Sequence, residues 1–395
     1  MAECGEDHRF PIQQIALDRW ERATRVNAAA DWMHGGRSAV EDFFRPRAEF
    51  APFARQLSSW SSEQLSDYVE AHRGESVGFL VLMMTGQCNA DCTICFTDRR
   101  KKAGELSPEE RIDLLRQAKR LGAQFVYVPG EGEPTIDGGF WSFLEVCREV
   151  DLPAIVFTNG LLLSDDDVCQ RYWGMDTAAA VRKLADYPVS FYVKHWSTDP
   201  TLVGDMMQID ASRYHFTEFD GVPVHAGLHA LLTSFPRERL GLEIVVERRN
   251  ADEVVRTLVP FAEKHGLARI VEMIQHNGRV FGDGAYDPTD EQAEAAQPLL
   301  SPTSCHLATC KAVVTSRGYL SPRIAILENQ LPPERQNVRN QDLFTLLHTT
   351  DYIVSRRYVL SCLCEQVPLE LAGAQGRLRS GPTSIVPRAL RIIQQ

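Results

Sequence analysis

Short apolar runs alternate with amphipathic segments through the middle of the chain. The runs that we predict as strands are 78–84, 124–128, 154–157, 189–194, 242–246 and 268–273. Segments with helix-start signals lie between them, at 107–121, 140–150 and 250–265. In the first of these, Ser107 is a good N-cap and Pro108 stands at the first helical position. Asn250 is expected to cap the last. Six β/α units in succession predict a parallel α/β sheet with right-handed crossovers.

The two flanks of this α/β unit have different patterns. Residues 11–74 are predicted to be mainly helical, and prolines after about residue 283 mark a linker. Two apolar segments around Arg317-Gly318 predict a β-hairpin, and a helical segment follows at 343–358. We therefore expect an N-terminal helical extension (1–75), the α/β unit (76–285), a small C-terminal α+β domain (286–372) and a tail (373–395).

Composition and charge narrow the classes of function. The chain has 395 residues with a formal net charge of −11, which argues against a nucleic-acid partner. No stretch reaches the roughly 18 apolar residues of a membrane span, and the N-terminus does not resemble a secretory signal. We therefore expect no membrane partner and a cytoplasmic location, where clustered cysteines indicate metal or redox chemistry.

Seven of the ten cysteines fall into two groups. Cys88, Cys92 and Cys95 have the spacing C-x3-C-x2-C directly after the first predicted strand. Their thiolates are soft ligands suited to an iron–sulfur cluster, whereas zinc usually takes four ligands, often in C-x2-C pairs. The second group comprises Cys305, Cys310, Cys362 and Cys364. It suits either an iron–sulfur cluster or a structural zinc ion, and the sequence leaves that choice open.

The first cysteine loop resembles the signature of the radical S-adenosylmethionine (SAM) superfamily. The resemblance implies a partial (β/α)6 barrel with its active site at the carboxyl ends of the strands. It also implies a [4Fe–4S] cluster with one open iron for SAM, which is cleaved to methionine and a hydrogen-abstracting 5′-deoxyadenosyl radical. The segment Gly130-Glu131-Gly132-Glu133-Pro134 is similar to the family's GGEP loop, which receives the SAM amine. Thr158-Asn159-Gly160 is similar to a recurrent end of the third strand.

The resemblance also suggests individual site residues. Those expected to contact SAM are Gly130, Glu131, Gly132, Glu133, Pro134, Asn159, Lys194, Ser197, Glu272 and Gln275. Lys194 or His195 is the candidate base, and Arg249 is the candidate group to hold a carboxylate or hydroxyl of the substrate.

The C-terminal cysteines resemble the entry to a SPASM or twitch domain, with one departure. Arg323 stands where a cysteine often follows the hairpin glycine, so we expect a twitch-like domain with a single auxiliary cluster. Such a cluster would accept an electron from a substrate radical. We therefore expect oxidation of an alcohol on a small sugar or aminocyclitol in natural-product (antibiotic) biosynthesis, with a flavodoxin- or ferredoxin-type reductant. The alternatives are modification of a ribosomal precursor peptide and a non-catalytic zinc-binding interaction protein.

Overall fold

The computed structural model describes residues 77, 79–95, 97, 103–123, 125–210, 215–274, 278–280, 284–300, 311–321 and 336–347. The predicted N-terminal extension and C-terminal tail lie outside these residues, as do Gln275 and the four C-terminal cysteines. The structure therefore describes the predicted α/β unit almost completely and the region after it in part.

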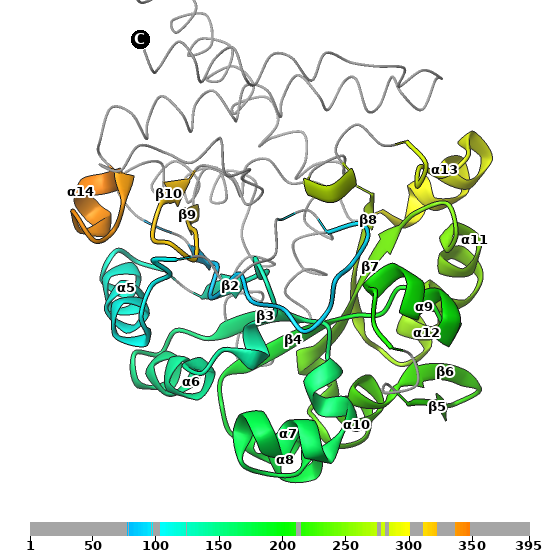
Figure 1. Ribbon diagram of the computed structural model, residues 1–395, viewed down its shortest axis with the longest axis horizontal. Helices are drawn as coiled ribbons and strands as arrows, with labels where there is room; N and C mark the ends of the chain where they lie inside the picture. Colours follow the sequence, from blue (N-terminus) through cyan, green and yellow to red (C-terminus); the bar gives the residue numbers. More distant parts are fainter. Residues whose placement is uncertain are drawn as a thin grey trace, which may run out of the picture.

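One sheet of eight strands forms the centre of the described chain (Figure 1). Its order is β10-β9-β1-β2-β3-β4-β7-β8, and every pair is parallel except β9–β10. The strands are β1 (Phe79–Leu82), β2 (Val126–Val128), β3 (Ala154–Thr158), β4 (Val189–Lys194), β7 (Leu240–Val246), β8 (Ala268–Met273), β9 (Lys311–Val314) and β10 (Leu320–Ser321). All six strands predicted from the apolar runs are present, which confirms the α/β class and the parallel arrangement.

Helices follow the strands and cover the outer side of the curved sheet (Figure 1). The α-helices are α5 (Pro108–Arg120), α6 (Phe140–Glu149), α7 (Asp166–Trp173), α8 (Thr177–Ala185), α9 (Pro200–Met207), α10 (Ala226–Ser234), α11 (Ala251–Glu253), α12 (Val259–Lys264), α13 (Asp290–Ala296) and α14 (Leu343–Leu347). Shorter elements are the 3₁₀ turns at Pro134–Ile136, Leu161–Ser164, Arg237–Arg239, Gly278–Val280 and Gln297–Leu299, and the hairpin of β5 (Phe216–Phe219) and β6 (Val222–His225).

Two of the predicted helix starts have different outcomes. Ser107 caps α5 as expected: its hydroxyl accepts from the Glu110 backbone N–H, and the Glu110 carboxylate accepts from the Ser107 N–H. The predicted side-chain cap at Asn250 is wrong. The Asn250 side-chain oxygen accepts instead from the Glu247 N–H (2.8 Å). Its NH2 group donates to the carbonyls of Trp196 and Val245 (2.8 Å each) and joins the segments after β4 and at the end of β7. The helix after it contains a π-helical stretch, Val254–Leu258.

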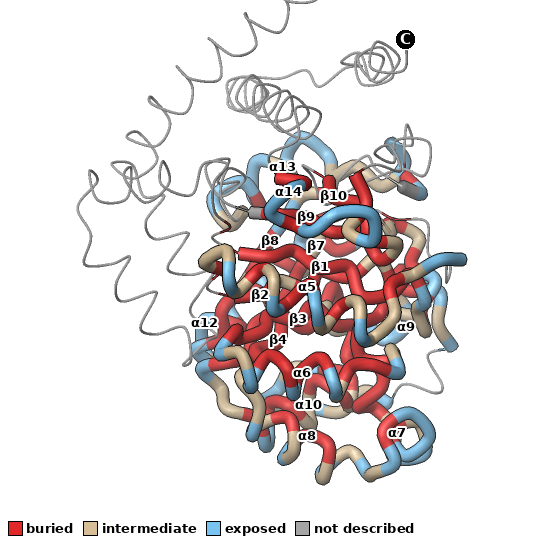
Figure 2. The backbone as a smooth tube through the Cα atoms, turned by 90° about the vertical axis from the view of Figure 1, so that its left-hand side faces the viewer, coloured by how far each residue is buried: buried red, intermediate tan, exposed pale blue. Residues whose placement is uncertain are grey.

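Side chains alternate between the two faces of the sheet. On β7, Leu242, Ile244 and Val246 pack in the core beneath the helices. Figure 2 shows this buried layer running through the middle of the molecule. The intervening Gly241, Glu243 and Val245 therefore face the inner side, where the sheet curves around a central space.

The predicted hairpin around Gly318 is present, and it extends the central sheet. β9 runs parallel to β1, with Phe79 opposite Lys311 and Leu82 opposite Val314, and β10 pairs with β9. Because β9 is parallel to β1, the hairpin turn lies at the same edge as the loop that follows β1. Among the described residues, no helix is both long and apolar enough to cross a membrane.

Candidate active site

The cysteine loop follows β1 and folds against the end of α9. The backbone N–H groups of Asp91 and Thr93 donate to the carbonyls of Met207 and Met206, each at 2.8 Å. Ile94 is buried beside Trp196 and Met206 in a small apolar cluster of its own. The apolar residue expected before the third cysteine therefore anchors the loop.

The three cysteines of this loop suit an iron–sulfur cluster by their chemistry. Their thiols form no disulfide; Cys92 is buried, and Cys88 and Cys95 are half-buried. In the described part of the chain, no three His, Cys, Asp or Glu side chains are close enough together to hold a single metal ion. The thiolates of a four-iron cluster need not converge on one ion, because each of them binds its own iron. The loop would therefore hold a cluster through these three thiolates.

Arg279 braces the cysteine loop from the other side of the site. Its guanidinium donates to the Asp91 carboxylate (2.5 Å) and to the Asp91 carbonyl (3.0 Å), and its backbone N–H donates to the Cys95 carbonyl (3.0 Å). The hydrogen bond with Asp91, together with the nearby charges of Asp91, Cys95 and Cys92, raises the pKa of Arg279. Arg279 ends the segment of Gln275, which was expected to contact SAM, but was not itself among the predicted SAM contacts.

The Gly130–Pro134 loop lies directly against the start of the cysteine loop. The Glu133 N–H donates to the Gln87 carbonyl at 2.8 Å. A Cβ atom on Gly132 would lie 2.0 Å from that same carbonyl oxygen, so only glycine fits there. Gly130 has φ of +84°, which glycine adopts without strain. The two loops that the sequence predicted to act together are in backbone contact.

The Glu133 carboxylate accepts its hydrogen bonds from other groups of the protein. It is almost fully buried and accepts from the Thr135 hydroxyl (2.7 Å) and N–H (3.2 Å), the Thr158 hydroxyl (2.7 Å) and the Asn159 N–H (2.8 Å). We had expected this carboxylate to be available to a cationic amine. The structure places it instead among protein donors that join the loop to the end of β3, which leaves the backbone carbonyls of the loop for the amine.

Asn159 and Glu131 complete the connections around the two loops. The Asn159 amide donates to the Asn89 side chain at 2.7 Å, inside the cysteine loop. The Glu131 carbonyl accepts from the Thr97 hydroxyl (2.7 Å), and its carboxylate accepts from the Ser316 N–H (2.9 Å) in the hairpin turn. The ends of β1, β2, β3 and β9 are therefore joined at one edge of the sheet.

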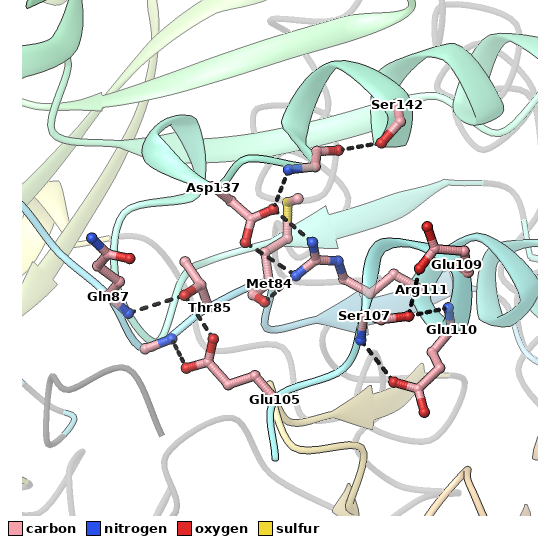
Figure 3. Close-up of polar contacts among 12 residues, drawn as sticks. Met84, Thr85, Gln87, Glu105, Ser107, Glu109, Glu110, Arg111, Asp137 and Ser142 are labelled. Carbon is pink, nitrogen blue, oxygen red and sulfur yellow. Dashed lines mark hydrogen bonds and ion pairs between the residues drawn. The ribbon is translucent and has the colours of Figure 1, made fainter. Parts of the chain in front are cut away.

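A second network fixes the point where β1 ends (Figure 3). The buried Arg111 guanidinium donates to the Met84 carbonyl (2.6 Å) and to both carboxylate oxygens of Asp137 (2.6 and 3.1 Å). The Glu105 carboxylate accepts from the Thr85 hydroxyl and the Gly86 N–H, each at 2.9 Å. These buried charges hold the cysteine loop and the segment after Pro134 in a fixed relation.

Lys194 lies at the end of β4 on the inner side of the sheet, directly opposite Glu243 of β7. Burial lowers the pKa of Lys194, but the charges of Glu243, Cys92, Glu133 and Cys88 outweigh this effect and raise it. The ammonium group therefore stays protonated at neutral pH. It is suited to hold negative charge near the cysteine loop, and poorly suited to act as a base.

His195 is fully buried and packs against His225, with ring centroids 5.9 Å apart. Burial, and then the charge of His225, lowers the pKa of His195 to about 3. Because Lys194 faces inward, His195 is the next residue along and points toward the helix side. These surroundings do not favour the role of base that the sequence suggested.

Three further predicted residues lie at the carboxyl ends of β4, β7 and β8. The Ser197 hydroxyl is buried and donates to the Glu253 carboxylate (2.5 Å), so it is engaged away from a ribose. The Arg249 guanidinium donates to the buried Glu247 carboxylate (2.7 Å) and lies over the Tyr286 ring. Glu272 lies on the inner face of β8.

Comparisons with known proteins agree with this arrangement. Residues 82–199 match the model of the Radical SAM superfamily. The GTP 3′,8-cyclase of Synechococcus sp. (strain CC9902) is 34% identical over 222 residues, which cover 52% of this chain and 58% of that protein. That of Synechococcus sp. (strain CC9605) is 33% identical over 99 residues, 22% of this chain and 28% of that protein. The chain thus spans between 28% and 58% of the length of these two cyclases.

The fold is also found among solved structures. The crystal structure of Streptococcus suis SuiB bound to S-adenosylmethionine covers 80% of this chain and 78% of its own, with a TM-score of 0.54 and 17% sequence identity. At this identity the likeness concerns the fold. The segment matched by the family model begins in β1 and contains the cysteine loop, the Gly130–Pro134 loop and β4, so this part of the α/β unit is similar to the radical SAM superfamily.

Proposed function

We propose that this chain is a radical SAM enzyme that abstracts a hydrogen atom from a small-molecule substrate. Cys88, Cys92 and Cys95 would hold a [4Fe–4S] cluster, and the carbonyls of the Gly130–Pro134 loop would receive the SAM amine. When bound, the cluster would supply one electron for cleavage of SAM to methionine and a 5′-deoxyadenosyl radical. A flavodoxin- or ferredoxin-type protein is the proposed reductant.

One observation carries this proposal: the two loops are built as a single unit. The Glu133–Gln87 backbone hydrogen bond, the close approach of Gly132 and the Asn159–Asn89 contact bring them together. Residues of this chain would thus position SAM beside the three thiolates before any substrate arrives. Lys194 and Arg279 supply positive charge beside the loop, which stabilises thiolates.

The finer proposal is net oxidation of an alcohol on a sugar or aminocyclitol. It depends on Cys305, Cys310, Cys362 and Cys364 holding an auxiliary iron–sulfur cluster as the electron acceptor. Four thiolates would leave that cluster no open iron, so electron transfer is its natural role. The two Synechococcus relatives are cyclases, and a cyclisation of the substrate radical is the competing outcome.

The experiment is anaerobic reconstitution followed by iron and sulfide analysis and by assay of SAM cleavage with dithionite. We expect about eight irons per chain and formation of 5′-deoxyadenosine. Replacing Cys88, Cys92 and Cys95 together by alanine should leave about four irons and abolish cleavage. Cys169→Ala, at a buried cysteine of α7, is the matched control and should retain both.

The results test separately the role of the cysteine loop in SAM cleavage and the role of the late cysteines in oxidation. Unchanged cleavage in the triple variant would refute the assignment of the cysteine loop. About four irons in the wild type, none in the triple variant and zinc in both would make the late cysteines structural, and the oxidation would lose its electron acceptor.

A further inference from the structure

Polar side chains gather on the inner face of the sheet at the level of the strand ends. Lys194 of β4 lies opposite Glu243 of β7, and on β8 the inner position nearest the cofactor loops is Glu272. The Trp196 indole N–H donates to the Glu243 carboxylate at 3.1 Å and so fixes its orientation. Three neighbouring strands thus present two carboxylates and one ammonium group to the same space.

This part of the inner face is open to solvent, whereas the part below it is filled. Glu272 is exposed, and Lys194, Val245 and Tyr127 are half-buried although all four lie on the inner face of the sheet. Lower on the same face, Phe157 and Tyr192 stack with ring centroids 5.0 Å apart and are buried. A molecule that enters beside the cofactor loops would therefore rest on the aromatic layer and contact the exposed Glu272, with the buried Glu243 on the neighbouring strand.

The charges of the side chains at the strand ends determine whether a cationic or an anionic molecule is favoured there. The single ammonium of Lys194 already interacts with Glu243, with Glu133 and with Cys88 and Cys92. At the carboxyl ends of the described strands, Lys194 is the one basic residue at an inner-face position. A second carboxylate, that of Glu272, adds to the negative potential at the strand ends, which attracts a cation and repels a polyanion.

We infer that Glu243 and Glu272 bind a protonated amine of the substrate, so that the enzyme acts on a small amine-bearing polyol and rejects nucleoside triphosphates. This inference rests on the proposed function for the site, and it assigns Glu272 to the substrate rather than to SAM. It also separates this chain from the GTP 3′,8-cyclases, whose name gives a nucleoside triphosphate as substrate.

The ionisation of Glu272 supports the geometry. Partial desolvation by neighbouring protein atoms, followed by the charge of Glu243, raises the pKa of Glu272 to about 7. A bound ammonium would lower that pKa again. Amine binding at pH 7 should therefore release a fraction of a proton, which calorimetry detects as a dependence of the binding heat on the ionisation enthalpy of the buffer.

The experiment is calorimetric titration of the reconstituted full chain, saturated with SAM, with a diaminocyclitol, with myo-inositol and with GTP. The first two share a hydroxylated cyclohexane ring, and only the diaminocyclitol carries amino groups. We expect the diaminocyclitol to bind at least about tenfold more tightly than inositol, and GTP more weakly than either. Glu272→Gln and Glu243→Gln should each remove most of this preference and leave the affinity for SAM within about twofold.

The matched control is Glu263→Gln, which removes one negative charge from α12, where Glu263 pairs with Arg269. It should keep the preference. Equal binding of diaminocyclitol and inositol, absence of binding by both, or tighter binding of GTP would overturn the inference, as would a loss of SAM affinity in Glu272→Gln. Formation of 5′-deoxyadenosine in the same preparations shows separately whether the proposed function stands.

Discussion

Gly132 is the residue at which the two cofactor loops touch, and it gives the first prediction. In Gly132→Ala the added Cβ would lie 2.0 Å from the Gln87 carbonyl oxygen, so the loops must move apart. We expect the affinity for SAM to fall at least about tenfold. Gly138→Ala is the control, because nothing lies within 4 Å of its Cβ position. Equal SAM affinity in the two variants, measured by calorimetry, would contradict the assigned role of the loop.

The buried ion pair of Arg111 and Asp137 gives a second prediction at the residue scale. Arg111 and Asp137 are 4% and 12% exposed, so removing the arginine leaves a buried carboxylate without its partner. Arg111→Met should lower the free energy of unfolding by about 3–5 kcal/mol. Arg116→Met removes an arginine of the same helix that pairs with Glu149 at the surface, and should cost at most about 1 kcal/mol. Urea unfolding of both variants measures the contrast, and similar losses would disprove it.

At the scale of elements, β4 and α10 meet through two buried histidines. Burial and the neighbouring charge of His225 lower the pKa of His195 to about 3, and burial lowers that of His225 to about 4. The ordinary value is 6.5, so between these values the unfolded chain binds more protons than the folded one. Stability is therefore complete above about pH 6.5 and is lost progressively as the pH falls toward 4.

We expect His195→Phe to reduce this acid sensitivity by about half. The measurement is the urea midpoint as a function of pH, compared with that of His229→Phe, which replaces a half-buried histidine of α10. An identical pH dependence for wild type and His195→Phe would show that the buried pair does not titrate as argued.

The sequence was most informative where one physical signal dominates. Apolar runs predicted β1, β2, β3, β4, β7 and β8, and Ser107 with Pro108 predicted the start of α5, because burial and capping are local properties. The β5–β6 hairpin and helices α7 to α10 were not predicted, although Asp165 and Asp176 cap α7 and α8 by the same kind of local contact. The Asn250 cap failed because its side-chain oxygen accepts instead from the Glu247 N–H at 2.8 Å, before the helix begins.

In the site, too, local signals were predicted and contacts between distant parts of the chain were not. Spacing identified the cysteine and glycine loops, and the structure brings these together. Spacing could not show that the Glu133 carboxylate accepts hydrogen bonds from Thr135, Thr158 and Asn159. It also could not show that Lys194 lies opposite Glu243. These properties depend on strand register, which brings together residues from different parts of the chain.

At the scale of the whole molecule, β9 completes the sheet beside β1. A chain that ends at residue 300 would lose β9 and leave one edge of β1 unpaired. We expect this chain to aggregate and to lose SAM binding, whereas a chain that ends at residue 372 keeps the hairpin and should retain both properties. Ala312→Pro, which removes a ladder hydrogen bond but no cysteine, should lower the melting temperature of the full-length protein. A monomeric shorter chain that melts like the wild type would refute this dependence.

The pairing of β1 with β9 also has a consequence for synthesis. β1 leaves the ribosome early, yet one of its two neighbours is made only after the rest of the described sheet. Until then the nascent chain presents an apolar strand edge just ahead of Cys88, Cys92 and Cys95. Slower translation at the end of the message would prolong this exposure. Chaperone demand and premature thiol oxidation during expression should therefore depend on how quickly the ribosome reaches the hairpin.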